Sequence, residues 1–310
     1  MTELFTRYEK NPILKPEQWP YPVNTVFNAG AAKMNGETVL LVRVEDKTGI
    51  SHLNTARSKN GISDWRISEK PSFAADPQNY PEEHWGVEDP RLTYLDEFGS
   101  YFIVYTAYSA EGPLVSLAKT DDFIAFERLG PILLPENKDA ALFPRKFGNR
   151  WALLHRPVQA SRAAHIWISF SPDLKHWGDH RVVIRAREGA WWDANKIGLG
   201  PQPVETEMGW LIIYHGVQLK ASGSSIYRLG LALLDPADPG KVICRSNEWV
   251  FGPKENYEHD GDVRDVTFPC GVIYDKASDE LRVYYGAADT AIALATAKMR
   301  DILTYLKSCK

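Results

Sequence analysis

Long apolar runs and cysteines are scarce in this 310-residue sequence. No apolar stretch approaches the roughly 20 residues of a membrane-spanning helix, so we expect no membrane partner. The three cysteines, Cys244, Cys270 and Cys309, are odd in number and widely spaced, which predicts reduced thiols and a cytoplasmic location. The Cys/His spacing of a metal site is missing as well, and we expect no metal.

The sequence also lacks a basic segment. Its formal net charge is −4, which gives no support for nucleic-acid binding. Residues 1–7 contain no apolar core of a secretory signal. The composition is that of a soluble globular protein, with 44% hydrophobic and 25% charged residues. Aromatic residues are abundant, with 10 tryptophans and 14 tyrosines. We assign most of them to packing and a minority to flat surfaces for sugar rings.

One short pattern recurs five times along the chain. Each copy has a proline or small residue at its start, then a short strand, a polar turn and a strongly apolar strand. The five copies cover residues 27–46, 89–105, 143–157, 200–216 and 268–286. Self-similarity at a regular spacing is typical of repeat folds, and many short strands with an aromatic motif in each unit favour a β-propeller.

We therefore predict an all-β fold, a five-bladed β-propeller with four strands in each blade. A β-sandwich is the main alternative, but it does not naturally give five equal units. The whole chain, 1–310, is expected to form a single domain. Within it, the Pro-rich extension 1–24 closes onto the last blade, and a short amphipathic helix lies at about 299–307.

Hairpin geometry places many polar groups at one mouth of the central channel. The start of the first strand of a hairpin and the end of its second strand lie at the same end. The starts of the first strands are Asn28, Asp89, Arg145, Gly200 and Phe268. The residues near the ends of the second strands are Arg43, Glu45, Tyr105, His155, Arg156, Tyr214, His215 and Asp289. These positions are unusually rich in groups able to carry out chemistry.

The segment 86–92 has the strongest local signal. Asp89 directly precedes Pro90, whose ring disfavours the α region for the residue before it, so we expect Asp89 to be extended. Successive side chains of an extended segment point to opposite faces, so Glu88 and Asp89 are not expected to share a cavity. An ordinary acidic turn before a strand is the alternative for this segment taken alone.

Eight short motifs occur at or near these positions. They are Phe27-Asn28-Ala29-Gly30, Gly86-Val87-Glu88-Asp89-Pro90-Arg91, Leu142-Phe143-Pro144-Arg145-Lys146, His155-Arg156-Pro157, Lys196-Ile197-Gly198, Tyr214-His215-Gly216-Val217, Phe268-Pro269-Cys270 and Tyr285-Gly286-Ala287-Ala288-Asp289. These motifs resemble those of glycoside hydrolase family 130, the β-mannoside phosphorylases with a five-bladed propeller. The resemblance runs in order from about residue 10 to residue 297.

The resemblance implies inverting, reversible phosphorolysis of a β-linked mannosyl di- or oligosaccharide to α-D-mannose 1-phosphate and a shortened sugar. Asp89 matches the general acid, whose proton is relayed through the mannosyl 3-hydroxyl. The positions that match phosphate-binding residues are Lys138, Arg156, Lys196 and His215. The positions that match residues around the mannosyl ring are Asn28, Arg43, Glu45 and Asp289, and we add Arg91 and Tyr227 as substrate-binding candidates.

The chemistry of these residues agrees with the resemblance. An inverting glycosidase needs an acid and also a base that activates water. A phosphorylase needs only the acid, because inorganic phosphate, its co-substrate, is already an anionic nucleophile; it then needs cations to hold that anion, and no other cofactor is expected. Two alternatives stay open: an inverting β-mannosidase, which would carry a second carboxylate near the phosphate positions, and a non-catalytic sugar-binding propeller. The linkage (β-1,4 or β-1,2), the acceptor sugar, the chain-length preference and the homo-oligomeric state are also open.

Overall fold

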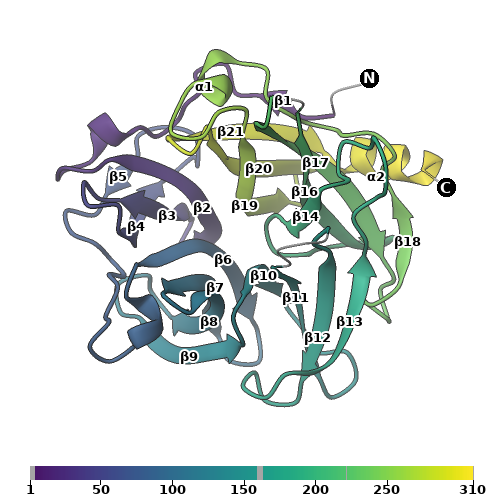
Figure 1. The fold of residues 1–310 in the computed structure, drawn as a ribbon, viewed down its shortest axis with the longest axis horizontal. Helices are drawn as coiled ribbons and strands as arrows, with labels where there is room; N and C mark the ends of the chain where they lie inside the picture. Colours follow the sequence, from purple (N-terminus) through teal and green to yellow (C-terminus); the bar gives the residue numbers. More distant parts are fainter. Residues whose placement is uncertain (1–3, 159–162, 221, 310) are drawn as a thin grey trace.

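Five antiparallel sheets surround a central axis in the protein (Figure 1). The structure is a computed structural model that describes residues 4–158, 163–220 and 222–309. Each sheet is one blade, and the innermost strand of each blade lines the channel. The predicted five-bladed propeller is therefore confirmed.

The first three blades follow one another along the chain with four strands each. Blade 1 contains β2 (Thr25–Met34), β3 (Glu37–Glu45), β4 (Ser51–Ser58) and β5 (Arg66–Ile67). Blade 2 contains β6 (Val87–Leu95), β7 (Ser100–Ser109), β8 (Gly112–Thr120) and β9 (Glu127–Leu133). Blade 3 contains β10 (Asn137–Leu142), β11 (Trp151–Pro157), β12 (Ile166–Ser171) and β13 (Gly178–Ile184).

The last two blades depart slightly from this plan. Blade 4 contains β14 (Lys196–Leu199), β15 (Val204–Thr206), β16 (Gly209–Leu219), β17 (Ser225–Leu234) and β18 (Val242–Arg245), and both β14 and β15 pair with β16. Blade 5 contains β19 (Thr267–Asp275), β20 (Glu280–Ala287), β21 (Ala291–Lys298) and, as its outermost strand, β1 (Thr6–Arg7). The short helices are η1 (Pro16–Gln18), η2 (Pro81–Glu83) and α1 (Asn256–His259).

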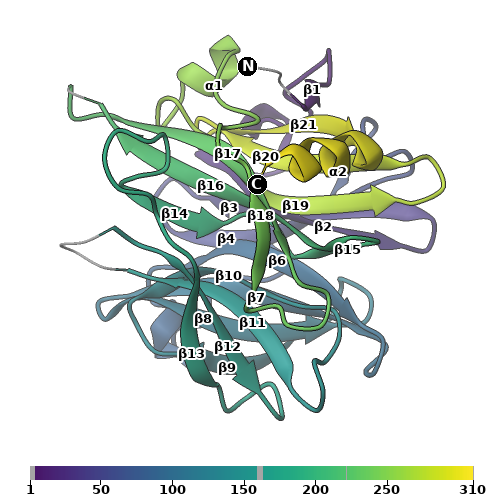
Figure 2. The ribbon, with the colours of Figure 1, turned by 90° about the vertical axis from the view of Figure 1, so that its right-hand side faces the viewer.

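The two ends of the described chain meet on blade 5. β1 pairs with β21, and the backbone of Leu14 exchanges hydrogen bonds with that of Ile292. Helix α2 (Met299–Ser308) covers the same region, with Ile302 and Leu306 buried against strands of blades 4 and 5 (Figure 2). The first and last blades are thus joined by strand pairing that uses residues from opposite ends of the sequence.

The second strand of each blade is buried on both faces, because neighbouring blades pack against both sides of the sheet. In β3, Leu40, Leu41 and Val42 are all buried, although their side chains alternate between the two faces. This explains why the second strands are continuous apolar runs rather than alternating patterns. The same strands supply the five apolar segments that reveal the repeat in the sequence.

Four innermost strands, β2, β6, β10 and β19, contain a bulge, and the bulges of β2, β6 and β10 each hold a residue with a positive φ near the mouth of the channel. In β6, Glu88 pairs with Thr106 and Arg91 pairs with Val104, so β6 carries one extra residue. The same shift occurs in β2 and in β10. Asp89 lies in the bulge of β6 with a φ of 51°. Bulges redirect side chains and are common next to functional sites.

The left-handed backbone of Asp89 corrects the prediction of an extended conformation. Its counterparts in the bulges of β2 and β10 are Asn28 (φ 49°) and Asp139 (φ 51°). Asn and Asp adopt this region more readily than most residues, since their short polar side chains make local hydrogen bonds. Pro90 disfavours the right-handed α region of Asp89, but the bulge, where proline needs no ladder hydrogen bond, selects the left-handed region instead.

A buried carboxylate fastens the loop before the innermost strand in three blades. In blade 2, Glu83 accepts hydrogen bonds from the hydroxyl of Tyr105 on the second strand (2.7 Å) and from Nε of Arg128 on the fourth strand (2.9 Å). In blade 4, Asp193 accepts from Tyr214 and Arg245. We call this arrangement the carboxylate–tyrosine–arginine anchor.

Blade 5 has the same anchor, and here it also holds the N-terminal strand. Glu258 accepts from the hydroxyl of Tyr285 (2.7 Å) and from Nε of Arg7 (2.8 Å). Its side chain is fully buried. The anchor therefore links the loop before β19, the second strand and the outermost strand of the last blade.

Removal of the Glu258 carboxylate is expected to destabilise the fold strongly. In Glu258→Ala, the guanidinium of Arg7 and the hydroxyl of Tyr285 lose a buried partner, and breaking a buried pair typically costs about 3–5 kcal/mol. Glu205→Ala is the matched control because Glu205 forms an exposed ion pair with Arg145 at 3.0 Å, and such pairs contribute about 0–1 kcal/mol. Urea unfolding measures both changes in the free energy of unfolding. Equal effects of the two substitutions would contradict this role of the anchor.

Candidate functional site

A cavity of about 190 Å³ opens at the mouth of the channel where the bulges of β2, β6 and β10 lie. Nine of the eleven predicted site residues line it: Asn28, Arg43, Asp89, Lys138, Arg156, Lys196, His215, Tyr227 and Asp289. The remaining lining residues are Asp139, Val263, Val266 and Phe268. All five blades contribute to this cavity, so the hairpin geometry brings together residues that are up to 261 positions apart in the sequence.

Two predicted residues lie outside the cavity. Glu45 accepts a hydrogen bond from Nδ2 of Asn24 at the protein surface (3.0 Å). Arg91 is only 1% exposed, and its guanidinium lies among backbone carbonyl groups. It donates to the carbonyl oxygens of Asp89 (2.8 Å), Leu199 and Gly200. Glu45 and Arg91 therefore do not line this cavity, and their contact with the substrate stays a prediction.

The predicted position of Arg145 at the same mouth is wrong, because Arg145 lies near the opposite mouth of the channel. Its side chain is 46% exposed and forms an ion pair with Glu205. The residue that occupies the expected place in blade 3 is Asp139, which the sequence analysis did not select. The sequence does contain a pattern that indicates Asp139, because Lys138-Asp139-Ala140-Ala141 and Phe27-Asn28-Ala29-Gly30 share a short polar residue followed by two small ones. The repeated Phe-Pro and Pro-Arg pairs are a stronger pattern, and they indicate Arg145 instead.

Asp89 is surrounded by donors and positive charge. Its Oδ1 accepts hydrogen bonds from Nδ2 of Asn28 (2.9 Å) and from Nη1 of Arg43 (3.1 Å). Burial raises the pKa of Asp89, but Arg43, Lys138 and Arg91 outweigh burial and hold that pKa below its usual value. Glu88 also binds Arg43 (2.9 Å) yet does not line the cavity, in line with the expected separation of the two acids.

Asp139 lines the cavity and contacts two arginines and a histidine. Its Oδ2 accepts a hydrogen bond from Nε of Arg156 at 2.7 Å and lies 3.6 Å from Nε2 of His215, while its Oδ1 is 3.5 Å from Nη2 of Arg91. Burial raises the pKa of Asp139, yet the positive charges of Arg156 and Arg91 hold it far below the usual range. Asp139 is therefore a permanent negative charge that the surrounding cations neutralise.

His215 is neutral in this environment. Burial lowers its pKa to about 3, and the positive charges of Arg156 and Lys196 add to that effect against the opposing influence of Asp139. Gly198 faces the imidazole across the strand pair β14–β16, and a Cβ at Gly198 would collide with the ring and with Asp139. The glycine in the Lys196-Ile197-Gly198 motif therefore makes room for the imidazole.

Three buried polar atoms of the cavity have no hydrogen-bond partner among the described residues. They are Oδ1 of Asn28, Oδ1 of Asp139 and Nδ1 of His215. Most buried polar atoms in proteins are hydrogen-bonded, so such atoms call for an explanation, and a bound polar ligand is one. The guanidinium of Arg156 also has donors to spare, because Nε makes its only side-chain hydrogen bond within the described residues. The cavity thus offers donors and acceptors that a polar ligand can satisfy.

Asp289 is the cavity's carboxyl group with a raised pKa. Burial raises the pKa of Asp289 to about 7, against the attraction of Arg43 and with the help of Asp89. It follows β20 in a turn where both Ala288 and Asp289 have positive φ. Two carboxyl groups of the same cavity, Asp89 and Asp289, are therefore in opposite states near pH 6: the first is ionised and the second is largely protonated.

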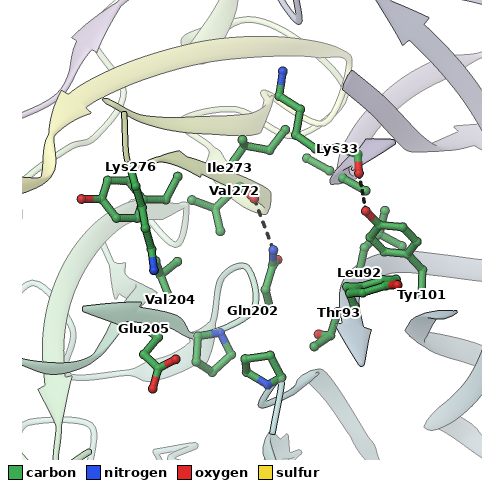
Figure 3. Close-up of a pocket in the computed structure, with 16 residues that line it drawn as sticks. Lys33, Leu92, Thr93, Tyr101, Gln202, Val204, Glu205, Val272, Ile273 and Lys276 are labelled. Carbon is green, nitrogen blue, oxygen red and sulfur yellow. Dashed lines mark hydrogen bonds between the residues drawn. The ribbon is translucent and has the colours of Figure 1, made fainter. Parts of the chain in front are cut away.

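The opposite mouth of the channel has a different chemistry. A cavity of about 330 Å³ lies there, bordered by Lys33 and Lys276 and by the ring of Tyr101 (Figure 3). Gln202 points across it and donates to the carbonyl oxygen of Val272 (3.2 Å). Its single acidic side chain, Glu205, is paired with Arg145. This mouth therefore lacks the buried carboxylates found around Asp89.

Neither a metal cluster nor a membrane helix is found in the described part of the chain. Residues 4–158, 163–220 and 222–309 contain no group of three or more His, Cys, Asp or Glu side chains placed to hold a metal ion. No helix within these ranges is long and apolar enough to cross a membrane.

The fold and the cavity together define a class of protein: a propeller whose channel mouth combines buried carboxyl groups with a cluster of lysine and arginine side chains. A glycoside hydrolase family 130 model, described as beta-1,4-mannooligosaccharide phosphorylase, matches residues 5–308. The chain therefore belongs to glycoside hydrolase family 130, as the sequence motifs indicated.

Characterised relatives are similar over nearly the whole chain. The chain is 33% identical to a beta-1,4-mannooligosaccharide phosphorylase from Ruminococcus albus, over 99% of this chain and 92% of the relative. It is 37% identical to a 1,2-beta-oligomannan phosphorylase from Thermoanaerobacter sp., over 96% of this chain and 98% of the relative. The structure of a beta-1,2-mannobiose phosphorylase from Listeria innocua, in complex with beta-1,2-mannobiose, superposes with a TM-score of 0.88 at 32% identity and covers 98% of this chain and 99% of that one.

Asp289→Asn is expected to stabilise the protein more at pH 8 than at pH 5. The pKa of Asp289 is about 7 in the folded protein and about 3.8 in the unfolded chain. The folded state therefore binds more protons, and the stability contributed by this group falls as pH rises through that interval. An uncharged asparagine does not titrate and so removes this loss of stability at high pH, which is on the order of a few kcal/mol at about 1.4 kcal/mol per pKa unit. Urea unfolding at both pH values measures the difference. An effect that does not change with pH would contradict the raised pKa.

Proposed function

We propose that this protein is an inverting β-mannoside phosphorylase, which uses inorganic phosphate to cleave a β-mannoside and gives α-D-mannose 1-phosphate and a shortened sugar. The observation that carries the proposal is the placement of Lys138, Arg156 and Lys196 in one cavity with the buried carboxyl group of Asp89. The names of the relatives support the same reaction. The reduced cysteines fit a cytoplasmic enzyme.

Phosphate is held by Lys138, Arg156, Lys196 and His215 in this proposal. Phosphate must lose its hydration shell to enter the channel, and an unpaired buried anion is prohibitively costly. Several cations offset that cost. Asp139 holds Nε of Arg156, which leaves the terminal nitrogens free to make the two parallel hydrogen bonds that suit a phosphate group. Neutral His215 adds one hydrogen bond without further charge.

Asp89 acts as the general acid, and phosphate binding prepares it for this role. In the empty cavity Lys138 and the arginines keep Asp89 ionised. A bound phosphate brings negative charge close to the same cations, which offsets their effect and raises the pKa of Asp89. The protonated carboxyl group then delivers its proton to the leaving oxygen by way of the mannosyl 3-hydroxyl, as the family resemblance implies. Phosphate attacks the anomeric carbon from the opposite face, and the configuration is inverted.

The mannosyl ring is bound by Asn28, Arg43, Tyr227 and Asp289. The first two also touch Asp89, so they orient the acid and the sugar together. A protonated Asp289 can donate a hydrogen bond to a sugar hydroxyl, which a carboxylate cannot. Tyr227 supplies an aromatic face beside Lys196, whose ammonium group is 5.4 Å from the ring centre.

A hydrolase on the same fold would need a base that activates water. Asp139 is a second carboxyl group next to the phosphate positions, so the structure provides a candidate. However, Oδ2 of Asp139 is bound to Arg156, and the pKa of Asp139 is held far below its usual range, so it is a weak base. A base near neutral pKa would be more effective. The cluster therefore favours phosphate over water as the nucleophile.

Asp89→Asn is expected to keep the fold and to lower kcat by at least about a hundredfold in both phosphorolysis and synthesis, since general acid catalysis contributes about 10²–10⁴-fold. An unchanged circular dichroism spectrum establishes that the fold is kept, and release of mannose 1-phosphate measures the rate. Near-normal turnover of this variant would exclude Asp89 as the acid.

Arg156→Ala is expected to lower kcat/KM for phosphate by an amount on the order of 2–5 kcal/mol, by analogy with truncation of a buried charge pair. Binding of the mannoside alone should change much less. Arg145→Ala is the matched control, because Arg145 is an exposed arginine near the other mouth. Initial rates against phosphate concentration measure both variants. A similar loss in the two variants, or an unchanged phosphate dependence in Arg156→Ala, would argue against the phosphate site.

A further inference from the structure

Blade 3 lacks the carboxylate–tyrosine–arginine anchor that blades 2, 4 and 5 share. The residue that corresponds to the anchor tyrosine is His155, which precedes the channel-facing Arg156 as Tyr214 precedes His215. Nδ1 of His155 lies 3.0 Å from the side-chain amide of Asn137, and Nε2 lies 2.7 Å from the hydroxyl of Ser169. His155 thus takes the place of the anchor tyrosine, and its partners are an amide and a hydroxyl group instead of a carboxylate.

A cavity of about 380 Å³ lies at this position, between the outer end of blade 2 and the adjacent face of blade 3. It is larger than the cavity around Asp89. The buried side chains of Asn137 and His155 form one side, and the indoles of Trp167 and Trp177 and the imidazole of His180 form another. Nε1 of Trp167 is buried and has no hydrogen-bond partner among the described residues.

The lining of this cavity suits a neutral, polyhydroxylated ligand. Burial lowers the pKa of His155 to about 3, so its imidazole is uncharged. Glu136 is the one acidic residue of the lining, and neither lysine nor arginine contributes to it. Aromatic faces combined with a few polar side chains are typical of small-molecule sites. A phosphate or nucleotide would lack positive partners here, whereas a sugar ring can stack on an indole and hydrogen-bond to imidazole and amide groups.

The cavity is also close to the mouth of the channel. Asn137 directly precedes Lys138, and His155 directly precedes Arg156, so each residue pair places one side chain on this cavity and the next one on the cavity around Asp89. Successive side chains of a strand point to opposite faces, so the two cavities lie on opposite faces of the β10–β11 pair at the same strand ends. A saccharide chain has to cross these ends to reach Trp167 from the mouth. Leu134, which is 84% exposed, borders the same route.

We propose that the cavity bounded by Asn137, His155, Trp167 and His180 is a distal subsite for a β-linked oligosaccharide, which gives the enzyme a preference for longer substrates. This inference rests on the proposed function, since it assumes that the saccharide chain starts at Asp89. It adds a position at which the chain is recognised away from the bond that is cleaved.

A binding experiment tests the subsite without turnover. In an Asp89→Asn background, isothermal titration calorimetry compares a β-mannobiose with a β-mannotetraose, in both β-1,4 and β-1,2 linkages. We expect the tetrasaccharide of one linkage to bind about tenfold more tightly than its disaccharide, equal to about 1.4 kcal/mol. When Trp167→Ala is added, the two sugars should bind equally tightly. His180→Ala should make the difference in affinity smaller. Trp191→Ala is the control, because Trp191 is an exposed tryptophan in the connection between β13 and β14, does not line this cavity and should leave the ratio unchanged.

The outcomes separate the subsite from the proposed function. If the ratio is absent in the Asp89→Asn protein, or if it survives both Trp167→Ala and His180→Ala, the subsite is wrong. Binding that depends on Trp167, in a wild-type enzyme that releases no mannose 1-phosphate from any of these sugars, would support the subsite and contradict the phosphorylase proposal. A fall in the ratio with Trp191→Ala as well would show a general effect on the fold and would also count against the subsite.

Discussion

One buried guanidinium group, that of Arg91, holds three blades together beneath the mouth of the channel. It donates to the carbonyl oxygen of Asp89 in its own blade, to those of Leu199 and Gly200 at the end of the innermost strand of blade 4, and lies 3.5 Å from the carboxylate of Asp139 in blade 3. A guanidinium is suited to this because its donors form a rigid fork and it stays charged when buried. The positions of Asp89 and Asp139 therefore depend on one side chain that does not line the cavity.

The charges above Arg91 follow from this constraint. Asp139 is ionised at every relevant pH and compensates Arg156, so the cavity can keep several cations in a small volume while it is empty. Without such compensation, several positive charges in one small cavity would repel one another and be costly to bury. In the proposed mechanism, phosphate adds a second set of negative charges next to the same cations. A proposed anion site can therefore contain carboxylates of its own.

The sequence predicts the architecture well because the repeat is carried by apolar second strands, which need burial on both faces and so cannot vary much. The mouth is predicted in outline for a related reason: residues at equivalent hairpin ends, such as Arg156 and His215, must meet wherever five hairpins form a ring. The predicted roles of the individual site residues came from the resemblance to the motifs of family 130. The geometry of the hairpins does not determine, to within a few residues, which residue of each copy lies at the mouth.

The errors have two physical origins. The Pro144-Arg145 pair repeats Pro90-Arg91 and so indicates Arg145, but Arg145 lies six residues after Asp139 and near the opposite mouth of the channel. The repeat therefore places the start of the blade 3 copy too far along the chain. Arg91 illustrates a second limit: an arginine beside a catalytic carboxyl group looks the same in a sequence whether it faces the ligand or the protein interior. Only its partners, here backbone carbonyl groups, distinguish the two.

The most direct test of the central claim compares cleavage of a β-mannoside in phosphate buffer with cleavage in a phosphate-free buffer of equal ionic strength. The account predicts cleavage that depends on phosphate and yields α-mannose 1-phosphate, because the cationic cluster above Asp139 holds the nucleophile. Free mannose released at the same rate in both buffers, without mannose 1-phosphate, would contradict it and would identify the protein as a hydrolase.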